Sequence, residues 1–371
     1  MNSILPEYNK INNFILINDK KEPRYLFFDI FSHSKKVFLI CPGYTNDFVD
    51  FNNIVITFNN TVLSTKLDKF KFYLNVEYES IAVLIFKLPS GFFENIECYI
   101  NLTVKYKSYE KNFNIPHITY KKKPYFITQT TLCKYDYKLI VPWYNYYTSQ
   151  GTEHFFIYYN GKINEDIKTF MNKKNITLIE WDYYYFSHGK INNIDVFHHH
   201  AQMGQMNHNL WKYSKILSHH LIVNDLDEYM HIPRRKLSNY LKRNRNLYDA
   251  YCFKNRWSKC IDESDILSLK NIPDKIKISN LQYPFGSHSK MIYKCDKIFT
   301  IGVHKSKNPS LYKNPKCIMD NQSNLNLFHF INWSKIIYQN YDYLNTVVQN
   351  RKLKNNEKIE NIVNLNLTRQ Y

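Results

Sequence analysis

The stretch that decides the fold is HHLIVNDLDEYMHIP, residues 219–233, in which a short apolar run is followed directly by three carboxylates. On a β-strand successive side chains point to opposite faces, so Asp225 and Asp227 are expected to share one side while Leu226 points to the other. Two unpaired carboxylates this close would repel each other, and a hard divalent cation coordinated by oxygen removes that repulsion. The stretch therefore predicts a metal site at the carboxyl end of a buried strand.

A metal site of this kind suits a substrate that carries a diphosphate. Mg²⁺ and Mn²⁺ commonly take one or two protein carboxylates and complete their coordination with phosphate oxygens and water. The bound cation then stabilises negative charge as a diphosphate leaves. The alternative is that Asp-x-Asp forms a solvated turn or a helix cap. The apolar run before the motif and Glu228 after it favour the metal site.

The sequence before this stretch alternates between strand and helix patterns. The expected strands are 126–132, 154–159 and 176–181, and the expected helices are 137–148, which ends near Gly151, 166–171 and about 202–217. This alternation is typical of an α/β fold with a mostly parallel, Rossmann-like sheet and helices on both faces. Ligands of such sheets bind beyond the carboxyl ends of the strands, where Asp225 and Asp227 are expected.

The region before residue 121 has a different pattern. Six short runs of branched and aromatic residues are separated by Asn, Asp, Gly, Pro and Ser, at 25–28, 37–40, 54–58, 72–76, 81–86 and 96–100. We expect a small β-sandwich-like domain over 1–120, acting as a scaffold or an acceptor-recognition module. A basic connector leads to the α/β domain, 121–335, and a basic helical tail is expected over 336–371.

Bulk properties limit where the protein works. The chain has 371 residues, and no apolar run approaches the roughly 20 residues that cross a bilayer. Its beginning lacks the pattern of a secretory signal, and its seven scattered cysteines include no Cys-x-x-Cys pair. Reduced thiols and a cytoplasmic location are therefore expected.

The formal net charge of +18 is compatible with binding to nucleic acid. However, Lys, Asn, Ile and Tyr are abundant along the whole chain, as expected for an AT-rich genome such as that of a large DNA virus or a protist. Composition alone therefore accounts for the charge. Anionic partners, including nucleotide diphosphates, should still be attracted, less so at high salt.

From about residue 126 to 333 the chain resembles the nucleotide-sugar-dependent glycosyltransferases of GT-A fold, specifically glycosyltransferase family 92 and its relatives. The resemblance rests on these stretches: PWYNYYTSQGTEHFFIY at 142–158, QMGQMNHNL at 202–210, NDLDEY at 224–229, KMI at 290–292, IGVH at 301–304 and LFHF at 327–330. Each motif alone is weak, and their order over more than half of the chain is more specific. The N-terminal β region lies outside the resemblance.

The resemblance implies transfer of a sugar, often galactose from UDP-galactose, to an acceptor glycan or glycoprotein with inversion at the anomeric carbon. It also implies Mn²⁺ or Mg²⁺ as cofactor. Asp227 would bind the metal directly, Asp225 would contact the metal or the ribose, and Glu228 would orient them or touch the donor sugar. A late histidine would be the remaining ligand. His304 and His329 both qualify, and His304 is preferred because Gly302 allows the backbone to approach closely.

Four further residues are candidates for contact with the nucleotide sugar. Lys290 could neutralise the diphosphate, although a single lysine in so basic a chain is more often simply exposed. Gln202 leads the helix that resembles the family's glutamine-led helix. Thr131 and Lys134 lie where the first strand ends, but the sequence reads Lys-Tyr-Asp there, whereas relatives have an Asn-Glu pair. This departure affects the expected contacts with the nucleotide base.

Inversion also requires a general base beside the acceptor hydroxyl. Asp262, Glu263 and Asp265 form the one tight acidic cluster between the metal strand and Lys290, so they are the candidates. The alternative is a solvated surface loop. Two other functional classes stay open: a nucleic-acid-binding protein or metal-dependent phosphodiesterase, favoured by charge and paired carboxylates, and a glycan-binding scaffold that has lost its activity.

Overall fold

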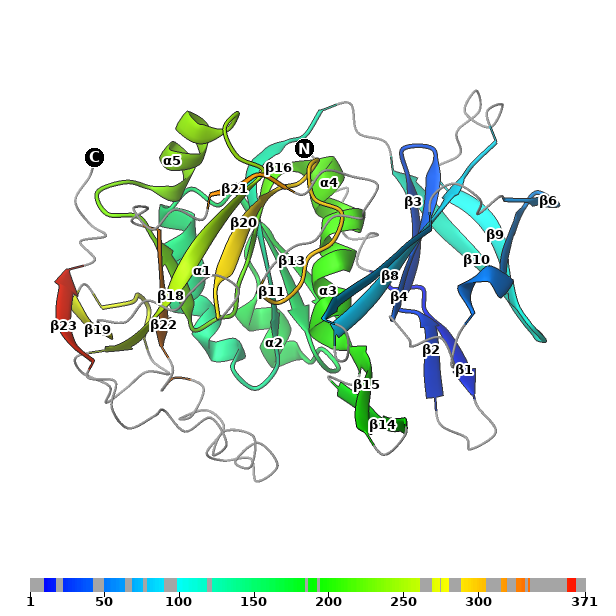
Figure 1. Ribbon diagram of the computed structural model, residues 1–371, viewed down its shortest axis with the longest axis horizontal. Helices are drawn as coiled ribbons and strands as arrows, with labels where there is room; N and C mark the ends of the chain where they lie inside the picture. Colours follow the sequence, from blue (N-terminus) through cyan, green and yellow to red (C-terminus); the bar gives the residue numbers. More distant parts are fainter. Residues whose placement is uncertain are drawn as a thin grey trace.

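The structure is a computed structural model and shows a mixed α/β protein in which strands predominate (Figure 1). The residues that it describes are 10–17, 23–42, 50–63, 69–75, 79–89, 99–118, 122–183, 186–191, 194–260, 269–273, 275–279, 288–304, 315–318, 325–330, 333 and 359–364. Within these ranges no helix is long and apolar enough to span a bilayer. The six cysteines that they include are free thiols.

The region before residue 119 is built from strands, as predicted. The strands are β1 Phe14–Ile17, β2 Pro23–Phe27, β3 Asp29–His33, β4 Lys36–Pro42, β5 Ile54–Phe58, β6 Thr61–Val62, β7 Lys69–Asn75, β8 Glu79–Lys87, β9 Tyr99–Tyr106 and β10 Tyr109–Ile118. A short 3₁₀ helix, Phe51–Asn53, precedes β5. β1 and β2 pair with each other, and the other described strands form one sheet in the order β6-β5-β9-β10-β3-β4-β8-β7. We call this sheet the N-terminal sheet.

Alternating side chains give the N-terminal sheet its core. In β9, Ile100, Leu102, Val104 and Tyr106 are buried, whereas Asn101 and Lys105, at alternate positions, are exposed. The buried side chains meet those of β4 and β8, including Leu39 and Leu84, in one apolar cluster. Burial of this kind contributes roughly 1.5–3 kcal/mol for each large aliphatic side chain.

The second, larger sheet carries the stretch from which the sequence analysis began. Its strands are β11 Tyr125–Cys133, β12 His154–Tyr159, β13 Ile176–Glu180, β16 Ser218–Val223, β17 Glu228–His231, β18 Ala250–Cys260, β19 Lys275–Ser279, β20 Lys290–Lys294, β21 Cys317–Ile318, β22 Asn326–Phe330 and β23 Ile359–Asn364. The main order is β13-β12-β11-β16-β20-β18-β19-β23, and β17, β21 and β22 join at the β18 side. We call it the central sheet.

The central sheet is mixed, which corrects the expectation of a mostly parallel sheet. β13, β12, β11 and β16 are parallel, whereas β20 is antiparallel to β16, and β18, β19 and β23 continue with antiparallel pairs. Parallel neighbours need a crossover of a dozen or more residues, usually through a helix. After β16, the eight-residue α5, Leu237–Asn244, precedes β18, and the described connections between the later strands contain no helix long enough for such crossovers.

The other helices lie before or beside β16. They are α1 Ile140–Ser149, α2 Glu165–Phe170, α3 Ala201–His208, the π-helix η5 Asn209–Ser214 and α4 Lys215–Leu217. A 3₁₀ turn, η4 Tyr137–Leu139, leads into α1, and a hairpin of β14 Phe186–Ile191 and β15 Ile194–His200 leads into α3. Gly151, just after α1, has a φ of +96°, as its predicted place at a helix end requires.

The two faces of the parallel strands pack into different cores. Phe155 and Ile157 of β12 pack in the cluster that contains Trp143 of α1. Phe156 and Tyr158, on the opposite face, pack in a cluster that contains α3 and one face of the N-terminal sheet. The continuous apolar run HFFIYY is typical of a parallel strand buried on both sides. Figure 1 shows α3 between β11 and the pair β4 and β8.

The chain changes from one sheet to the other between Ile118 and Tyr125, close to the expected boundary at residues 120 and 121. The division into separate domains stays a prediction. The tail differs from expectation, because Ile359–Asn364 is a strand, β23, paired antiparallel with β19, and not part of a helix. Local charge cannot reveal such a pairing, since it depends on a free sheet edge distant in sequence. The rest of 336–371 lies outside the described residues.

Candidate active site

The two central aspartates lie in a turn that joins β16 to β17. β16 ends at Val223, and the chain leaves the sheet at Asn224 before β17 begins at Glu228. The Glu228 N–H donates to the Asp225 carbonyl at 3.2 Å, which closes the turn. Strand alternation therefore does not apply to Asp225 and Asp227, and the expectation that they extend one strand is wrong. They instead contact different partners at the same edge of the sheet.

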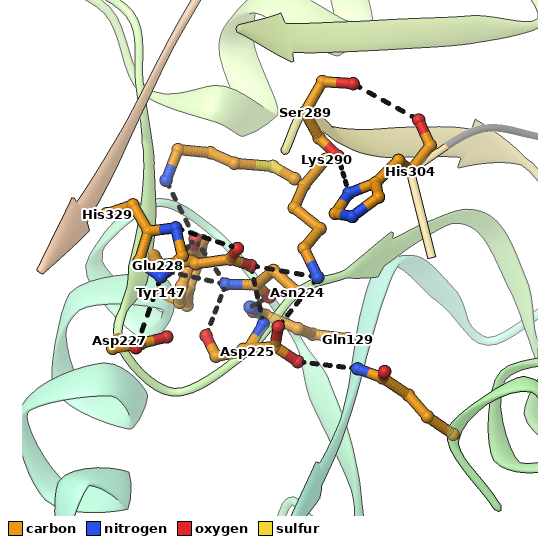
Figure 2. Close-up of polar contacts among 12 residues, drawn as sticks. Gln129, Tyr147, Asn224, Asp225, Asp227, Glu228, Ser289, Lys290, His304 and His329 are labelled. Carbon is orange, nitrogen blue, oxygen red and sulfur yellow. Dashed lines mark hydrogen bonds and ion pairs between the residues drawn. The ribbon is translucent and has the colours of Figure 1, made fainter. Parts of the chain in front are cut away.

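Lys290 joins Asp225 to Glu228 (Figure 2). Its Nζ lies 2.8 Å from Asp225 Oδ2 and 3.4 Å from Glu228 Oε2, and its side chain is buried. Gln202 donates from Nε2 to the other carboxylate oxygen of Asp225, Oδ1, at 2.9 Å. The Asp225 N–H donates to Glu228 Oε2 at 2.9 Å. Both oxygens of Asp225 are therefore held, while 37% of its side chain remains exposed.

His329 stands beside Asp227 and Glu228. β22 pairs with β17 so that His329 is directly opposite Glu228. Its Nε2 lies 3.4 Å from Asp227 Oδ2, and its Nδ1 lies 3.6 Å from Glu228 Oε1. The Phe330 N–H donates to the Asp227 carbonyl at 2.8 Å and holds this end of the turn against β22. Although burial lowers the pKa of His329, the charges of Asp227 and Glu228 outweigh it and raise the pKa above its usual value.

The close spacing of charged groups also shifts the pKa values of Glu228 and Lys290. Burial, together with the charges of Asp225 and Asp227, raises the pKa of Glu228 to about 7, although Lys290 and His329 counteract this rise. Burial alone would lower the pKa of Lys290, but Asp225 and Glu228 raise it above its usual range. Lys290 is therefore a permanent buried cation in this site at neutral pH.

Asn224 fixes the shape of the turn. Its Nδ2 donates to the Glu228 carbonyl at 2.7 Å and to the Tyr147 hydroxyl at 3.0 Å, and its Oδ1 accepts from Gln129 Nε2 at 2.7 Å. The Tyr147 hydroxyl donates to the Glu228 carbonyl and accepts from the Met230 N–H. Helix α1 and strand β11 therefore both support the carboxylates. Sequence reasoning did not single out these supporting residues.

Asp136 is a fourth carboxylate at this edge and was not among the site residues expected from sequence. It follows β11, and its Oδ1 accepts from the Lys134 N–H at 2.9 Å. Burial raises its pKa to about 6, and the charges of Asp227 and Asp225 add to the rise. A usable signal existed, because β11 and β16 are parallel neighbours, so residues that follow both strands meet at one edge.

The other expected donor-contact residues lie near this edge. The Thr131 hydroxyl is buried without a hydrogen-bond partner among the described residues. Lys134 contributes its N–H to Asp136, and its Nζ lies 5.3 Å from the centre of the Tyr135 ring. Asp262, Glu263 and Asp265 lie outside the described residues.

His304, which the sequence favoured over His329, has a different environment. Its Nδ1 lies 3.2 Å from the Ser289 carbonyl, and Ser289 Oγ donates to the His304 carbonyl. Figure 2 shows its contacts running to Ser289, on the far side of Lys290 from His329. Burial, with the charge of Lys290, lowers its pKa to about 4. The distances therefore bring His329, and not His304, to Asp227.

Asn255 is a further polar residue on this face of the central sheet. On β18 it lies between Phe253, which pairs with Lys290, and Trp257, which pairs with His329. Alternation places the three β18 side chains on one face. Both polar atoms of the buried Asn255 amide lack a hydrogen-bond partner among the described residues. Buried amides are nearly always paired, so a water or a ligand is the expected partner.

The described side chains include no group of three or more His, Cys, Asp or Glu residues arranged to hold a metal ion. Asp227 and His329 nevertheless form a pair with suitable chemistry. Two adjacent ligands of an octahedral Mg²⁺ or Mn²⁺ ion are separated by about 3 Å, and the two atoms are 3.4 Å apart. Such ions commonly take few protein ligands. The pair therefore fits a cation completed by phosphate and water.

Comparison with known proteins identifies the family of the chain. The sequence model of glycosyltransferase family 92 matches residues 128–367, a range that contains nearly all of the central sheet and every residue of the site described above. No curated protein matches the chain. Because the match covers more than half of the sequence, this chain belongs to glycosyltransferase family 92.

Proposed function

We propose that this glycosyltransferase transfers a hexose, often galactose in proteins of this kind, from a UDP-sugar to a glycan acceptor with inversion and with Mn²⁺ or Mg²⁺ bound. The observation that carries the proposal is one sheet edge where Asp225, Asp227 and Glu228 meet Lys290 and His329. Such an edge can bind a metal diphosphate, because carboxylates attract the cation and Lys290 attracts the phosphates.

The surrounding fold supports the same proposal. Four parallel strands, β13, β12, β11 and β16, end at this edge, and α1 and α3 pack in the clusters on their opposite faces. Nucleotides bind beyond the carboxyl ends of such strands. We propose that this half of the central sheet is the nucleotide-binding half of a GT-A fold, and that the half beyond β16 carries Lys290, Asn255 and His329 toward the sugar.

Asp227 and His329 would hold the cation, which would supply charge stabilisation to the departing diphosphate. Lys290 contributes a fixed positive charge from the opposite side of Glu228, and its burial strengthens that effect. Gln202 keeps the Asp225 carboxylate oriented. The Thr131 hydroxyl and the Asn255 amide, which have no hydrogen-bond partner within the described ranges, are polar groups that a donor or its water could engage.

Acceptor activation requires a base that inversion places opposite the leaving group. Asp262, Glu263 and Asp265 remain our candidates. Asp136 is a further titratable group at the edge, and its pKa of about 6 is suited to proton transfer near neutral pH. Changing each of these four residues to its amide, and comparing turnover with and without acceptor, would identify the base.

Donor hydrolysis tests the main proposal. The protein is incubated with UDP- and GDP-sugars and Mn²⁺, and release of nucleotide is measured for the wild type and for Asp227→Ala. We expect turnover of a UDP-sugar that falls at least about a hundredfold in the variant, as for loss of a preorganised charge-stabilising group. Unfolding should change little, since the variant loses the attraction of Asp227 to His329 but also its repulsion of Glu228 and Asp136.

The matched control is Asp296→Ala, because Asp296 is an exposed carboxylate that pairs with Lys123 away from the site. It should behave like the wild type. Absence of turnover with every donor, or equal turnover in Asp227→Ala, would contradict the proposal. With a transferring acceptor, the anomeric configuration of the product decides between inversion and retention. Tight, salt-sensitive binding to DNA or RNA without turnover would favour the nucleic-acid alternative.

A further inference from the structure

Helix α3 connects the candidate active site to the N-terminal sheet. At its beginning, Gln202 donates to Asp225 Oδ1 at 2.9 Å. One turn later, Gln205 donates to the Thr130 hydroxyl of β11 at 2.6 Å. At its end, His208 Nε2 lies 2.8 Å from Asp29 Oδ2, on β3 of the N-terminal sheet. All eight residues of α3 are buried, so a shift of the helix would disturb contacts at both ends.

The helix and the N-terminal sheet approach each other closely at Gly204. A Cβ atom on Gly204 would lie 2.6 Å from Cε2 and 2.9 Å from Cδ2 of Phe28, distances that real Cβ atoms do not show. Phe28 is held by its own N–H, which donates to the Ile40 carbonyl at 2.7 Å, and by rings that include Trp181 and Tyr183. The position of the Phe28 ring therefore limits how α3 can lie.

A buried ion pair fixes the other end of the helix. Asp29 Oδ2 accepts from Lys212 Nζ at 2.7 Å as well as from His208, and Oδ1 accepts from the N–H groups of Asn12 and Ile30. Burial alone would raise the pKa of Asp29, but Lys212 and His208 lower it, so the carboxylate is ionised. Moving either partner away would leave a charge buried without compensation, which is strongly unfavourable.

The same contacts define the proton position on His208. Because Nε2 faces a carboxylate it carries the hydrogen, and Nδ1 accepts from the Tyr158 hydroxyl at 2.7 Å. A series of hydrogen bonds thus runs from β12 of the central sheet to β3 of the N-terminal sheet, through Tyr158, His208, Asp29 and Lys212. It resists sliding of α3 along its axis.

We propose that the N-terminal sheet positions the donor site: Phe28 packs on Gly204, Asp29 anchors His208, and α3 thereby presents Gln202 to the Asp225 carboxylate. In this role Phe28, Gly204 and Asp29 are positioning residues, and the N-terminal sheet is part of the catalytic unit. The inference rests on the proposed function for its effect on turnover. The mechanical coupling between the sheet and the turn is independent of it.

The test adds a methyl group to α3 at Gly204, where the helix contacts Phe28, and then makes room for that methyl group by shortening the Phe28 side chain. Four variants are compared with the wild type: Gly204→Ala, Gly204→Ala with Phe28→Leu, Gln202→Ala, and Gln202→Ala with Gly204→Ala. Two quantities are measured for each: kcat/KM for the UDP-sugar donor, and deuterium uptake in peptides that cover residues 218–231. Alanine suits a helix better than glycine, so the first variant should still fold.

We expect Gly204→Ala to lower kcat/KM about tenfold, the effect of losing one hydrogen bond to a charged group, and to raise deuterium uptake at the β16–β17 turn. Phe28→Leu should recover most of both effects because it removes the clashing ring atoms. In the Gln202→Ala background, Gly204→Ala should cause no further loss of kcat/KM, because the hydrogen bond is already absent. General destabilisation would instead lower kcat/KM by the same factor in both backgrounds.

The inference is overturned if Gly204→Ala leaves kcat/KM and uptake unchanged, or if its effect on kcat/KM is the same with and without Gln202. If the wild type turns over no UDP-sugar, the proposed function fails. In that case deuterium uptake still decides the inference: increased uptake in Gly204→Ala that Phe28→Leu reverses supports the coupling, and unchanged uptake refutes it.

Discussion

Lys290 is the residue on which the charge balance of the site depends. Its buried ammonium group lies between Asp225 and Glu228, and the Glu228 carboxylate is itself buried. A buried pair of this kind adds little net stability compared with apolar residues, but removing one partner leaves the other charge uncompensated. Replacement of Lys290 should therefore weaken the fold as well as phosphate binding.

We predict that Lys290→Met lowers the free energy of unfolding by about 3–5 kcal/mol at pH 8, because Asp225 and Glu228 lose the buried cation that stabilises their ionised forms. Urea denaturation followed by circular dichroism measures the change. Adding Glu228→Gln should recover part of the loss, since it removes the buried carboxylate that no longer has Lys290 as a partner. Lys294→Met, on the same strand but at a half-exposed position, is the matched control and should change the stability by less than about 1 kcal/mol.

Sequence reasoning at this scale found residues that stand in recognisable motifs and missed those that depend on neighbours. Asp225, Asp227, Glu228 and Lys290 follow from the motif order. Asp136 does not, because its proximity to Asp227 arises only when β11 and β16 pair. The preference for His304 followed from its neighbouring glycine, whereas the antiparallel pairing of β17 with β22 brings His329 to Glu228.

At the scale of elements, helix α1 supports the turn through one hydroxyl. The Tyr147 hydroxyl contacts the Glu228 carbonyl, the Met230 N–H and the Asn224 amide, all of them buried. Its removal would take this partner from the Met230 N–H, whereas the Glu228 carbonyl and the Asn224 amide would keep their hydrogen bond to each other. Tyr144 lies on the same helix, and its hydroxyl makes a single contact with the Asn175 side chain in a partly exposed position.

We predict that Tyr147→Phe costs about 1–3 kcal/mol of stability, the penalty for one buried donor left unpaired, and raises the donor KM as the turn loosens. Tyr144→Phe should cost less than about 1 kcal/mol and leave KM unchanged. Thermal unfolding and donor titration measure the two effects. Equal losses in the two variants would contradict the assigned role of Tyr147.

Periodicity predicted most elements from β11 to β16 closely, because these strands and helices are continuous apolar patterns of ordinary length, but it did not predict the hairpin of β14 and β15. It predicted one helix over 202–217, and the chain is helical from Ala201 to Leu217 with a π-helical turn at Asn209–Ser214. The π turn contains Lys212, which pairs with Asp29 far away in sequence. The local sequence pattern cannot predict such a contact, and it cannot predict that β23 pairs with the edge of β19.

For the molecule as a whole, buried histidines link folding to pH. In the described part of the chain burial lowers the pKa of seven histidines: His33, His117, His154, His208, His220, His231 and His304. Below pH 6.5 the unfolded chain binds protons at these positions while the folded chain does not. The contributions of these seven histidines to the stability therefore fall as the pH is lowered through this window, and they outnumber the opposite contributions of Glu228, Asp136 and His329, whose pKa values are raised.

We predict a steep loss of thermal stability between pH 7 and pH 5. His208 alone, whose pKa falls from 6.5 to about 4, accounts for about 3 kcal/mol between these two pKa values. Scanning calorimetry at a series of pH values measures the slope. His208→Gln should lose less stability on acidification than the wild type, and His219→Gln, at an exposed position of β16, should follow the wild type. A melting temperature independent of pH in this range would refute the linkage.

Composition and strand pattern predicted two differently built regions at this scale, but not how they join. The apolar cluster around α3 takes side chains from both sheets. The joining residues are ordinary apolar side chains plus Asp29 and Lys212. The local sequence does not show that these apolar residues contact the other sheet, or that Asp29 and Lys212 form a buried pair and not an exposed one.

The pairing of β23 with β19 has a practical consequence for handling the protein. If the chain were shortened at about residue 335, β19 would lose its pairing with β23. The backbone N–H and C=O groups along that edge of β19 would then lack hydrogen-bond partners. Unpaired edge strands of this kind pair with strands of other molecules. We therefore expect the shortened protein to aggregate even if it keeps its catalytic activity. Purification handles are therefore better attached beyond Tyr371 than substituted for the last segment.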